Sequence, residues 1–389
     1  MTRVDDVFQF PASFGQEQLW YLHELAPAST AYNIAFAFDV RGDLDQAALE
    51  QAFGGLIQRH DALRTRFAVV DEQLQQIVHA DIPFRLETED LSACAEAGRG
   101  IELDRLNREC ARHRFDLLQA PLLFVRLVRL AEDHHRLLLC IHHIVVDHLS
   151  VLQLGKELGE LYATCRGDRA ATSRDVTVDD ERLQFPDYVI WQREQMSEEV
   201  IAHKLEYWNS ALGAKPHTLD LPTDRPRPAL QSFAGDELPV CLPRDLSSSL
   251  RSHAQREKQS LFVVMLAALN VVLHKYCGQR DLIVGCPMAN RQAEELQDVV
   301  GLFMNVLPVP IVVDPEQGFD QLAQHVRRQV TRTQAQQDTP FEKIVRAGEV
   351  AHAASHNPLV QVWFTFQDAP LALVLPGLDI VSEPLHNGG

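Results

Sequence analysis

Hydrophobic and polar positions follow two different periods along this chain of 389 residues. Stretches in which every second residue is apolar are typical of half-buried strands, whereas apolar residues spaced by three and four are typical of helices. In the first half, residues 137–144 are almost continuously apolar, which predicts a strand buried on both faces. The pattern also predicts strands at 32–40, 62–70 and 122–130, and helices at 44–59 and 151–165.

The second half repeats this mixture of elements. A long apolar helix is predicted at 260–276 and a helix with one polar face at 319–336. Strands are predicted at 281–287, 306–313 and 360–367. Strands and helices mixed in both halves indicate an α+β protein built from two lobes.

Two segments interrupt the pattern. Residues 166–183 are polar and acidic and predict an exposed loop, whereas residues 215–228 contain four prolines and predict an extended connector. We therefore expect an N-terminal lobe at 1–180 and a C-terminal lobe at 181–389. Within the latter we expect a bridging helix at 185–212 and a linker at 213–232.

Charge and cysteine content exclude several classes of function. The formal net charge of −18 argues against nucleic-acid binding and against an anionic membrane surface. Seven scattered cysteines without a CxxC pair argue against a disulfide framework or a structural zinc site. The N-terminus lacks the features of a signal peptide, and the longest apolar stretches are too short for a membrane span. These features predict a cytoplasmic protein that has no membrane partner.

The segment HHIVVDH at residues 142–148 holds the strongest candidates for chemistry. It follows the predicted buried strand and precedes a helix, and at such a junction a side chain can enter a cleft. A histidine there can act as a base, an acid or a hydrogen-bond donor. Two other interpretations are packed structural histidines and a metal site that includes His134 and His135. No Cys or Glu completes a ligand set at a familiar spacing, so we expect no metal.

This segment resembles the HHxxxDG signature of the condensation domains of nonribosomal peptide synthetases. Other family motifs are matched in the same order, which extends the resemblance over residues 13–368. These similar stretches are residues 13–20 (SFGQEQLW), 59–67 (RHDALRTRF), 188–193 (YVIWQR), 221–228 (LPTDRPRP), 300–307 (VGLFMNVL), 337–345 (QDTPFEKIV) and 357–364 (NPLVQVWF).

The resemblance implies two lobes like chloramphenicol acetyltransferase in a V-shaped pseudo-dimer, with the active site in a tunnel between them. It implies an acyltransferase that joins a donor acyl or peptidyl thioester to the amine of an acceptor aminoacyl thioester. Donor and acceptor carrier proteins would present both substrates on 4′-phosphopantetheine arms, so no cofactor would be bound covalently. An adenylation domain would neighbour this one in the full synthetase, and the product would be a secondary metabolite such as a siderophore or antibiotic. The motif variants most resemble domains that join an L-donor to an L-acceptor, and we expect a monomer.

The resemblance also implies roles for individual residues. His143 matches the histidine assigned to chemistry, and His142 the one that supports the local structure. Asp147 matches an aspartate that is ion-paired rather than reactive, and Arg291 in the stretch GCPMANR is its expected partner. Because α-amines have a pKa of about 7.7–8.0, a strong base is not required, and His143 could abstract a proton or only position the amine.

Several expectations concern the tunnel and the ends of the chain. We expect His148, Asn305, Gln361 and Trp363 to line the tunnel. His148 stands where the motif has glycine, so it either narrows the acceptor side or points elsewhere. The chain ends soon after the last motif, which suggests a truncated C-terminus with a poorly ordered tail at 373–389. An ester-forming acyltransferase and a non-catalytic recruitment scaffold are the alternative functions.

Overall fold

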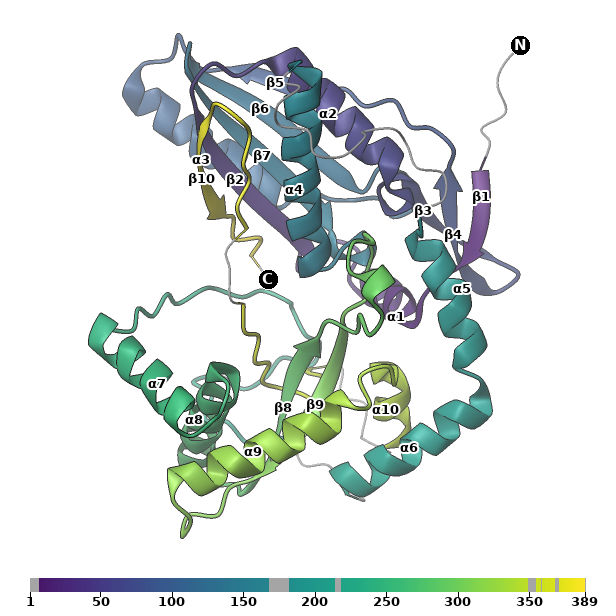
Figure 1. Ribbon diagram of the computed structural model, residues 1–389, viewed down its shortest axis with the longest axis vertical. Coiled ribbons are helices and arrows are strands. Elements are labelled where there is room, and N and C mark those ends of the chain that lie inside the picture. Colours follow the sequence, from purple (N-terminus) through teal and green to yellow (C-terminus); the bar gives the residue numbers. More distant parts are fainter. Residues whose placement is uncertain are drawn as a thin grey trace.

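A computed structural model describes residues 7–167, 182–213, 218–348, 355–357, 359–367 and 371–388 (Figure 1). The two halves of the chain form two lobes that are joined along one side by helices (Figure 1). The predicted exposed loop at 166–183 falls largely outside the described residues, as do residues 214–217 of the linker predicted at 213–232.

The N-terminal lobe is built on a five-stranded sheet with the order β10-β2-β7-β6-β5. β5 pairs with β6 in parallel, and the other neighbours in this sheet are antiparallel. A three-stranded sheet, β1-β4-β3, lies beside it. The strands are β1 (Val7–Pro11), β2 (Asn33–Arg41), β3 (Thr65–Val70), β4 (Gln73–His79), β5 (Glu87–Asp90), β6 (Leu123–Ala131), β7 (His134–His142) and β10 (Asp379–Pro384).

Helices cover both faces of the larger sheet, which is why β7 reads as continuously apolar. Leu137 and Ile141 face the core beneath α2 and α4, whereas Leu138 and Cys140 face α3. The prediction of a strand buried on both faces is confirmed. The predicted strand at 62–70 is correct only from Thr65, because η1 precedes it. The helices are α1 (Phe14–Leu25), α2 (Gln46–Arg59), α3 (Glu96–Ala111) and α4 (His148–Cys165), with 3₁₀ turns η1 (Asp61–Arg64) and η2 (His143–Val145).

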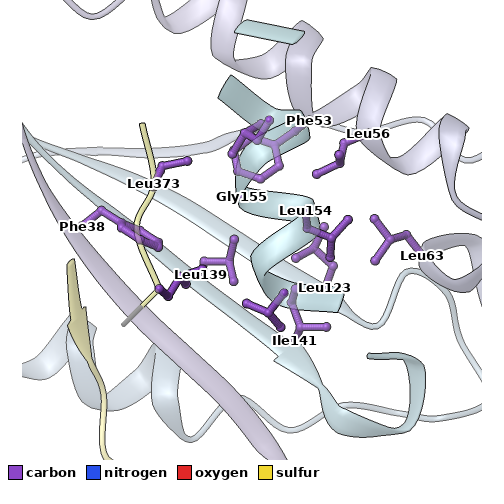
Figure 2. Close-up of a pocket in the computed structure, with 13 residues that line it drawn as sticks. Phe38, Phe53, Leu56, Leu63, Leu123, Leu139, Ile141, Leu154, Gly155 and Leu373 are labelled. Atoms are coloured by element: carbon purple, nitrogen blue, oxygen red, sulfur yellow. The ribbon is translucent and has the colours of Figure 1, made fainter. Parts of the chain in front are cut away.

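The last described segment returns to the N-terminal lobe. β10 pairs with β2, and Leu371 and Leu373 join the core against α4. Figure 2 shows Leu373 on this segment facing Phe38 and the Gly155 turn of α4, around a small apolar cavity of about 30 Å³. A Cβ on Gly159 would lie 2.3 Å from the carbonyl oxygen of Val374, so glycine allows this close crossing.

Two expectations for the end of the chain are therefore wrong. Residues 371–384 pack on the N-terminal lobe, so a C-terminal lobe running without interruption from 181 to 389 does not describe them. The tail expected to be poorly ordered contains β10 and its hydrogen bonds to β2. The local sequence could not show this, because the pairing joins positions more than 330 residues apart.

The predicted bridging helix at 185–212 is two helices, α5 (Phe185–Gln195) and α6 (Glu198–Leu212). The helix breaks at Met196 and Ser197, and the Ser197 hydroxyl caps α6 by accepting a hydrogen bond from the Val200 amide. α5 packs its Phe185 directly on Gly301, where a Cβ would lie 2.0 Å from the ring. The first connecting helix is thus fixed against the C-terminal lobe.

The C-terminal lobe contains the antiparallel pair β8 (Asp281–Met288) and β9 (Asn305–Val312) with helices packed on it. The helices are α7 (Arg244–Arg256), α8 (Leu261–Cys277), α9 (Phe319–Gln334) and α10 (Phe341–Ala347), with the turn η3 (Glu294–Leu296). The predicted strand at 360–367 is reduced to one parallel bridge between Gly285 and Trp363. A Cβ on Gly285 would lie 2.4 Å from Val360, so this segment packs closely on β8 but pairs with it at one residue.

All seven cysteines are free thiols. In the described ranges, no three His, Cys, Asp or Glu side chains are arranged to hold a metal ion. Within the same ranges no single helix is long and apolar enough to span a membrane; only the pair α7 and α8, bent by 110°, reaches that length and composition.

Candidate active site

The site is built where β7 ends and the chain turns into η2. The His143 amide donates a 2.8 Å hydrogen bond to the Tyr32 carbonyl, which continues the pairing with β2 by one residue. His142 is buried, and its Nδ1 accepts a 3.2 Å hydrogen bond from the Ile144 amide. This bond holds the turn that follows the strand, and His143 is released from the sheet at that point.

His142 is held in its neutral form. Burial lowers the pKa of its imidazole to about 3, and the neighbouring His23 and His143 act in the same direction. Its ring makes edge-on contacts with His23 and Phe115, at centroid distances of 6.3 and 5.9 Å. A neutral, packed ring that accepts a backbone hydrogen bond supports the turn and has no access to a substrate.

His143 opens into a cavity of about 220 Å³ that residues of both lobes line. The N-terminal lobe contributes α1 and Tyr32, α5 contributes Gln192, and the C-terminal lobe contributes the residues around β9 and α10. His143 Nδ1 is buried and makes no hydrogen bond with the described residues. The lining residues are Ser13, Phe14, Gly15, Gln18, Leu19, Ala31, Tyr32, His143, Gln192, Asn290, Leu302, Phe303, Met304, Asn305, Val306, Asp338, Pro340, Glu342 and Trp363.

Asp147 does not touch His143; it is enclosed by hydrogen-bond donors behind the turn. Its Oδ1 caps α4 by accepting from the Ser150 amide and hydroxyl, each at 2.8 Å. Arg291 from the other lobe donates to Oδ1 at 3.0 Å and to Oδ2 at 3.3 Å, and the Phe303 amide donates to Oδ2 at 3.2 Å. Both charged side chains are nearly inaccessible, 3% and 1% exposed. The partner expected from the sequence is the one observed.

Further contacts extend this network between the lobes. The Ser150 hydroxyl oxygen also lies 2.9 Å from the Gly301 carbonyl oxygen, which is a second acceptor for its single proton, and it accepts a 3.0 Å hydrogen bond from the Gly301 amide. Arg291 donates to the carbonyls of Leu296 and Val299, and its guanidinium lies 4.0 Å from the Phe303 ring centroid. The turn that carries His143 is therefore tied to the opposite lobe on its rear side.

The four expected tunnel residues divide into two pairs. Asn305 and Trp363 line the cavity; Asn305 also holds the loop before α10 by donating to the carbonyls of Gln337 and Thr339, and Trp363 is 47% exposed. Gln361 does not line it, because its side chain binds the Leu219 amide and the Asn357 carbonyl.

His148 is also not among the lining residues. As the first residue of α4 it is fixed by the cap at Asp147, and it is half-buried beside the cavity rather than in its wall. Burial lowers the pKa of its imidazole, the Asp147 charge opposes this shift, and the His143 charge adds to it. Neither His148 nor Gln361 is in the lining of this cavity, and their place along the tunnel stays a prediction.

Several cavity residues were not recognised from the sequence, among them Gln192 and Glu342. Gln192 and Glu342 stand within stretches that match family motifs, yet nothing local marks them as facing the same space as His143. Gln192 Oε1 and Glu342 Oε1 are both buried and have no hydrogen-bond partner among the described residues. Burial raises the pKa of Glu342 to about 7, and the charge of Glu17 adds to this shift.

Comparisons with known proteins agree with this architecture. The family model for the condensation domain matches residues 9–383. The chain is 39% identical over 373 residues to a linear gramicidin synthase of Brevibacillus parabrevis, covering 96% of this chain but only 7% of that protein. It is also 36% identical over 369 residues to the chondramide synthase of Chondromyces crocatus, covering 95% of this chain and 9% of that protein. The chain therefore corresponds to a small part of such relatives.

Solved structures show the same fold. A four-domain nonribosomal peptide synthetase, holo-AB3403 bound to AMP and glycine, superposes with a TM-score of 0.86 at 23% identity, over all of this chain and 30% of that one. The X-domain from teicoplanin biosynthesis, solved in complex with OxyB, gives 0.82 at 26% identity, over 99% of this chain and 82% of that one. The two lobes form the V-shaped, chloramphenicol acetyltransferase-like arrangement that the sequence predicts.

Proposed function

The chain belongs to the condensation-domain family, and on that premise we propose that it joins a donor acyl or peptidyl thioester to the amine of an acceptor aminoacyl thioester. One observation supports this more than any other. His143 enters a cavity that both lobes line, while the turn that carries it is tied from behind to the opposite lobe. His143 is thus presented in a cavity of about 220 Å³ between the two lobes.

The proposed reaction forms one C–N bond and breaks one C–S bond. The amine nitrogen attacks the thioester carbonyl, the resulting tetrahedral intermediate expels the thiolate, and the nitrogen's proton is transferred to the sulfur. Holding both reacting groups in one cavity supplies proximity, and a hydrogen bond from His143 would orient the amine or stabilise the intermediate. General acid–base help from such a group typically contributes a factor of about 10²–10⁴.

The proposed partners follow from the substrates. Two carrier proteins would deliver the donor and acceptor on phosphopantetheine arms, and an adenylation domain would load the acceptor carrier. We propose an L-donor and L-acceptor pairing, a monomeric cytoplasmic domain, and a peptide secondary metabolite as product. The similarity to a linear gramicidin synthase supports a place within a larger peptide synthetase.

A reconstituted reaction tests the proposal. The chain is mixed with one carrier bearing an acyl thioester and a second bearing an aminoacyl thioester, and the intact carriers are weighed by mass spectrometry. The expected result is transfer of the acyl group onto the second carrier through an amide. A reaction with donor carrier alone controls for hydrolysis.

The same experiment separates the alternatives. Transfer only to an acceptor that carries a hydroxyl in place of the amine would indicate an ester-forming enzyme. The likeness to an X-domain solved with OxyB supports a second candidate, a recruitment scaffold. A folded chain that transfers nothing to either acceptor would contradict the proposed reaction and favour that candidate.

A further inference from the structure

The wall of the cavity contains two buried side-chain oxygens that accept no hydrogen bond from the described residues. Glu342 at the start of α10 and Gln192 on α5 each have an Oε1 atom that is buried and unpartnered among the described residues. A buried acceptor left without a partner is costly, so each one requires an explanation. Two such atoms from different elements in one cavity indicate a ligand that brings N–H donors.

The polar groups beside these two residues are already satisfied. Asp338 lies on the same cavity, but Lys204 pairs with its Oδ1 at 2.9 Å. Asn305 donates to two carbonyls, and the Gln192 amide nitrogen donates to the Tyr188 hydroxyl at 3.2 Å. Among the described side chains of the lining, the buried oxygens that lack a partner are these two Oε1 atoms.

The cations near Glu342 are engaged elsewhere or remain at a distance. Lys343 lies 5.8 Å from the Phe14 ring centroid. Arg193 lies 4.1 Å from the same centroid and pairs with Glu17 at 2.5 Å. Glu342 Oε1 therefore receives no hydrogen bond from a cation among the described residues.

We propose that Glu342 and Gln192 form a binding subsite for the amino group of the acceptor aminoacyl thioester. This inference rests on the proposed function and adds to it the residues that recognise the nucleophile. An ammonium group has three N–H donors and a positive charge, so it satisfies both acceptors and supplies a counter-ion for the carboxylate.

The protonation of the subsite suits this ligand. Burial raises the pKa of Glu342 to about 7, near the value of about 7.7–8.0 for an α-amine. The charged groups that face Glu342 from neighbouring elements have opposing effects. Glu17 on α1 raises its pKa, whereas Lys343 and Arg346 on α10 lower it, and the Asp338 carboxylate is balanced by Lys204 on α6.

Because burial disfavours the charged form of both groups, the proton can pass from the bound ammonium to the carboxylate. The step converts ammonium and carboxylate into amine and carboxylic acid, so charge and protons balance. The neutral nitrogen then attacks the thioester, and Glu342 returns its proton to solvent after the product leaves. His143 need not deprotonate the ammonium in this scheme.

Binding of two acceptor mimics tests the subsite without any chemistry. One is a stable aminoacyl-pantetheine amide, and the other is the same molecule lacking its amino group; both affinities are measured by calorimetry at pH 7.5. We expect the wild-type chain to prefer the amino compound by roughly 10- to 100-fold, as for a hydrogen bond to a charged group. In Glu342→Gln this preference should fall below about threefold, while affinity for the compound without the amine stays unchanged.

A second cavity variant and two exposed control variants distinguish loss of the subsite from a general effect of substitution. Gln192→Met should weaken the preference in part, and it decides the matter if Glu342→Gln does not fold. Glu194→Gln and Gln195→Met make the corresponding changes at exposed positions of α5 and should retain the full preference. A preference that survives in both cavity variants, or is absent in the wild type, would overturn the subsite. Amide formation by the wild type is measured separately with loaded carriers, so failure of the proposed function is distinguishable from failure of this inference.

Discussion

Two carboxylates at the His143 site, Asp147 and Glu342, differ in how many hydrogen bonds they accept. Behind the turn that carries His143, Asp147 accepts hydrogen bonds from Ser150, Arg291 and the Phe303 amide. In the cavity wall, Glu342 Oε1 accepts none from the described residues. The first group is a closed network that joins the lobes, and the second is open toward the space where substrates would bind. The difference distinguishes residues that hold the site in place, such as Asp147, from residues that would contact the substrates, such as Glu342.

Energetics give this contrast a physical meaning. A buried ion pair with complete hydrogen bonding adds little net stability but is expensive to break, because one charge is left buried alone. An unpartnered buried acceptor lowers stability from the outset, and a ligand that donates a hydrogen bond to it would remove that cost. Substitutions in the Asp147 network should therefore change mainly the stability of the protein. Substitutions of the cavity residues should change mainly substrate binding or the reaction.

The largest effect is expected from Asp147→Ala. It leaves Arg291 buried without its carboxylate and removes the cap of α4, so the free energy of unfolding should fall by about 3–5 kcal/mol. Urea-induced unfolding followed by circular dichroism measures this loss. Asp147→Ala combined with Arg291→Met removes both charges and should cost less than the sum of the single changes. Additive losses would mean that the pair is not coupled.

His143→Ala should leave the stability of the protein nearly unchanged and reduce its activity. The side chain makes no hydrogen bond within the described ranges through Nδ1, so stability should change by no more than about 0.5 kcal/mol. Amide formation, followed by mass spectrometry of the loaded carriers, should fall by a factor of at least ~100. His203→Ala, at a side chain that is 85% exposed, is the matched control and should keep full activity. Equal turnover by a folded His143 variant would remove this residue from the reaction.

The hydrogen-bond network around Asp147 was easier to predict from the sequence than the unpartnered oxygens of Glu342 and Gln192. The strand before His142 and the helix after Asp147 follow from apolar periods, which are local properties of the chain. The pairing of Asp147 with Arg291 follows from similarity to a family and not from spacing. β10 and the break at Ser197 escaped prediction, because one depends on a distant partner strand and the other on a single cap.

Gln192 and Glu342 were not predicted as cavity residues for a related reason. In the sequence each is an ordinary polar residue at the start or toward the end of a helix, and only the packing of α5 and α10 around one cavity removes them from water. Burial and the lack of a partner are properties of tertiary structure. A motif match marks such a position as similar to a family but does not show which side chain is unsatisfied.

The third effect depends on pH. Since the folded pKa of Glu342 is raised to about 7 from its ordinary value of 4.5, the folded chain binds this proton more tightly than the unfolded chain. Its contribution to stability is present below about pH 4.5 and is lost as pH rises through 7. Glu342→Gln should therefore raise the free energy of unfolding at pH 8 by roughly 1–3 kcal/mol relative to wild type, with no difference near pH 4.

Paired urea titrations of wild type and variant across this pH range measure the difference directly, because the other carboxylates titrate in both. Glu194→Gln changes an exposed carboxylate and should leave the stability curve within about 0.5 kcal/mol of wild type at every pH. A Glu342→Gln variant that is less stable than wild type at pH 8 would indicate that the carboxylate has a stabilising partner and belongs to the closed group.

The smallest effect on stability and activity is expected from a substitution of His148, which lies between the Asp147 network and the cavity. It follows Asp147 directly and its imidazole is close enough to His143 for their charges to interact, yet it is not in the cavity wall. His148→Gly restores the residue of the family motif at the first position of α4, and the loss of stability should stay below about 1 kcal/mol. Because no cavity surface changes, relative rates with a glycyl and a bulkier aminoacyl acceptor should shift by less than about threefold, roughly 0.7 kcal/mol. Competition between the two acceptor carriers measures this ratio. A larger increase in the relative rate with the bulkier acceptor would show that the His148 side chain restricts the space for the acceptor. His148 would then belong with the residues that contact substrate and not with those that support the turn.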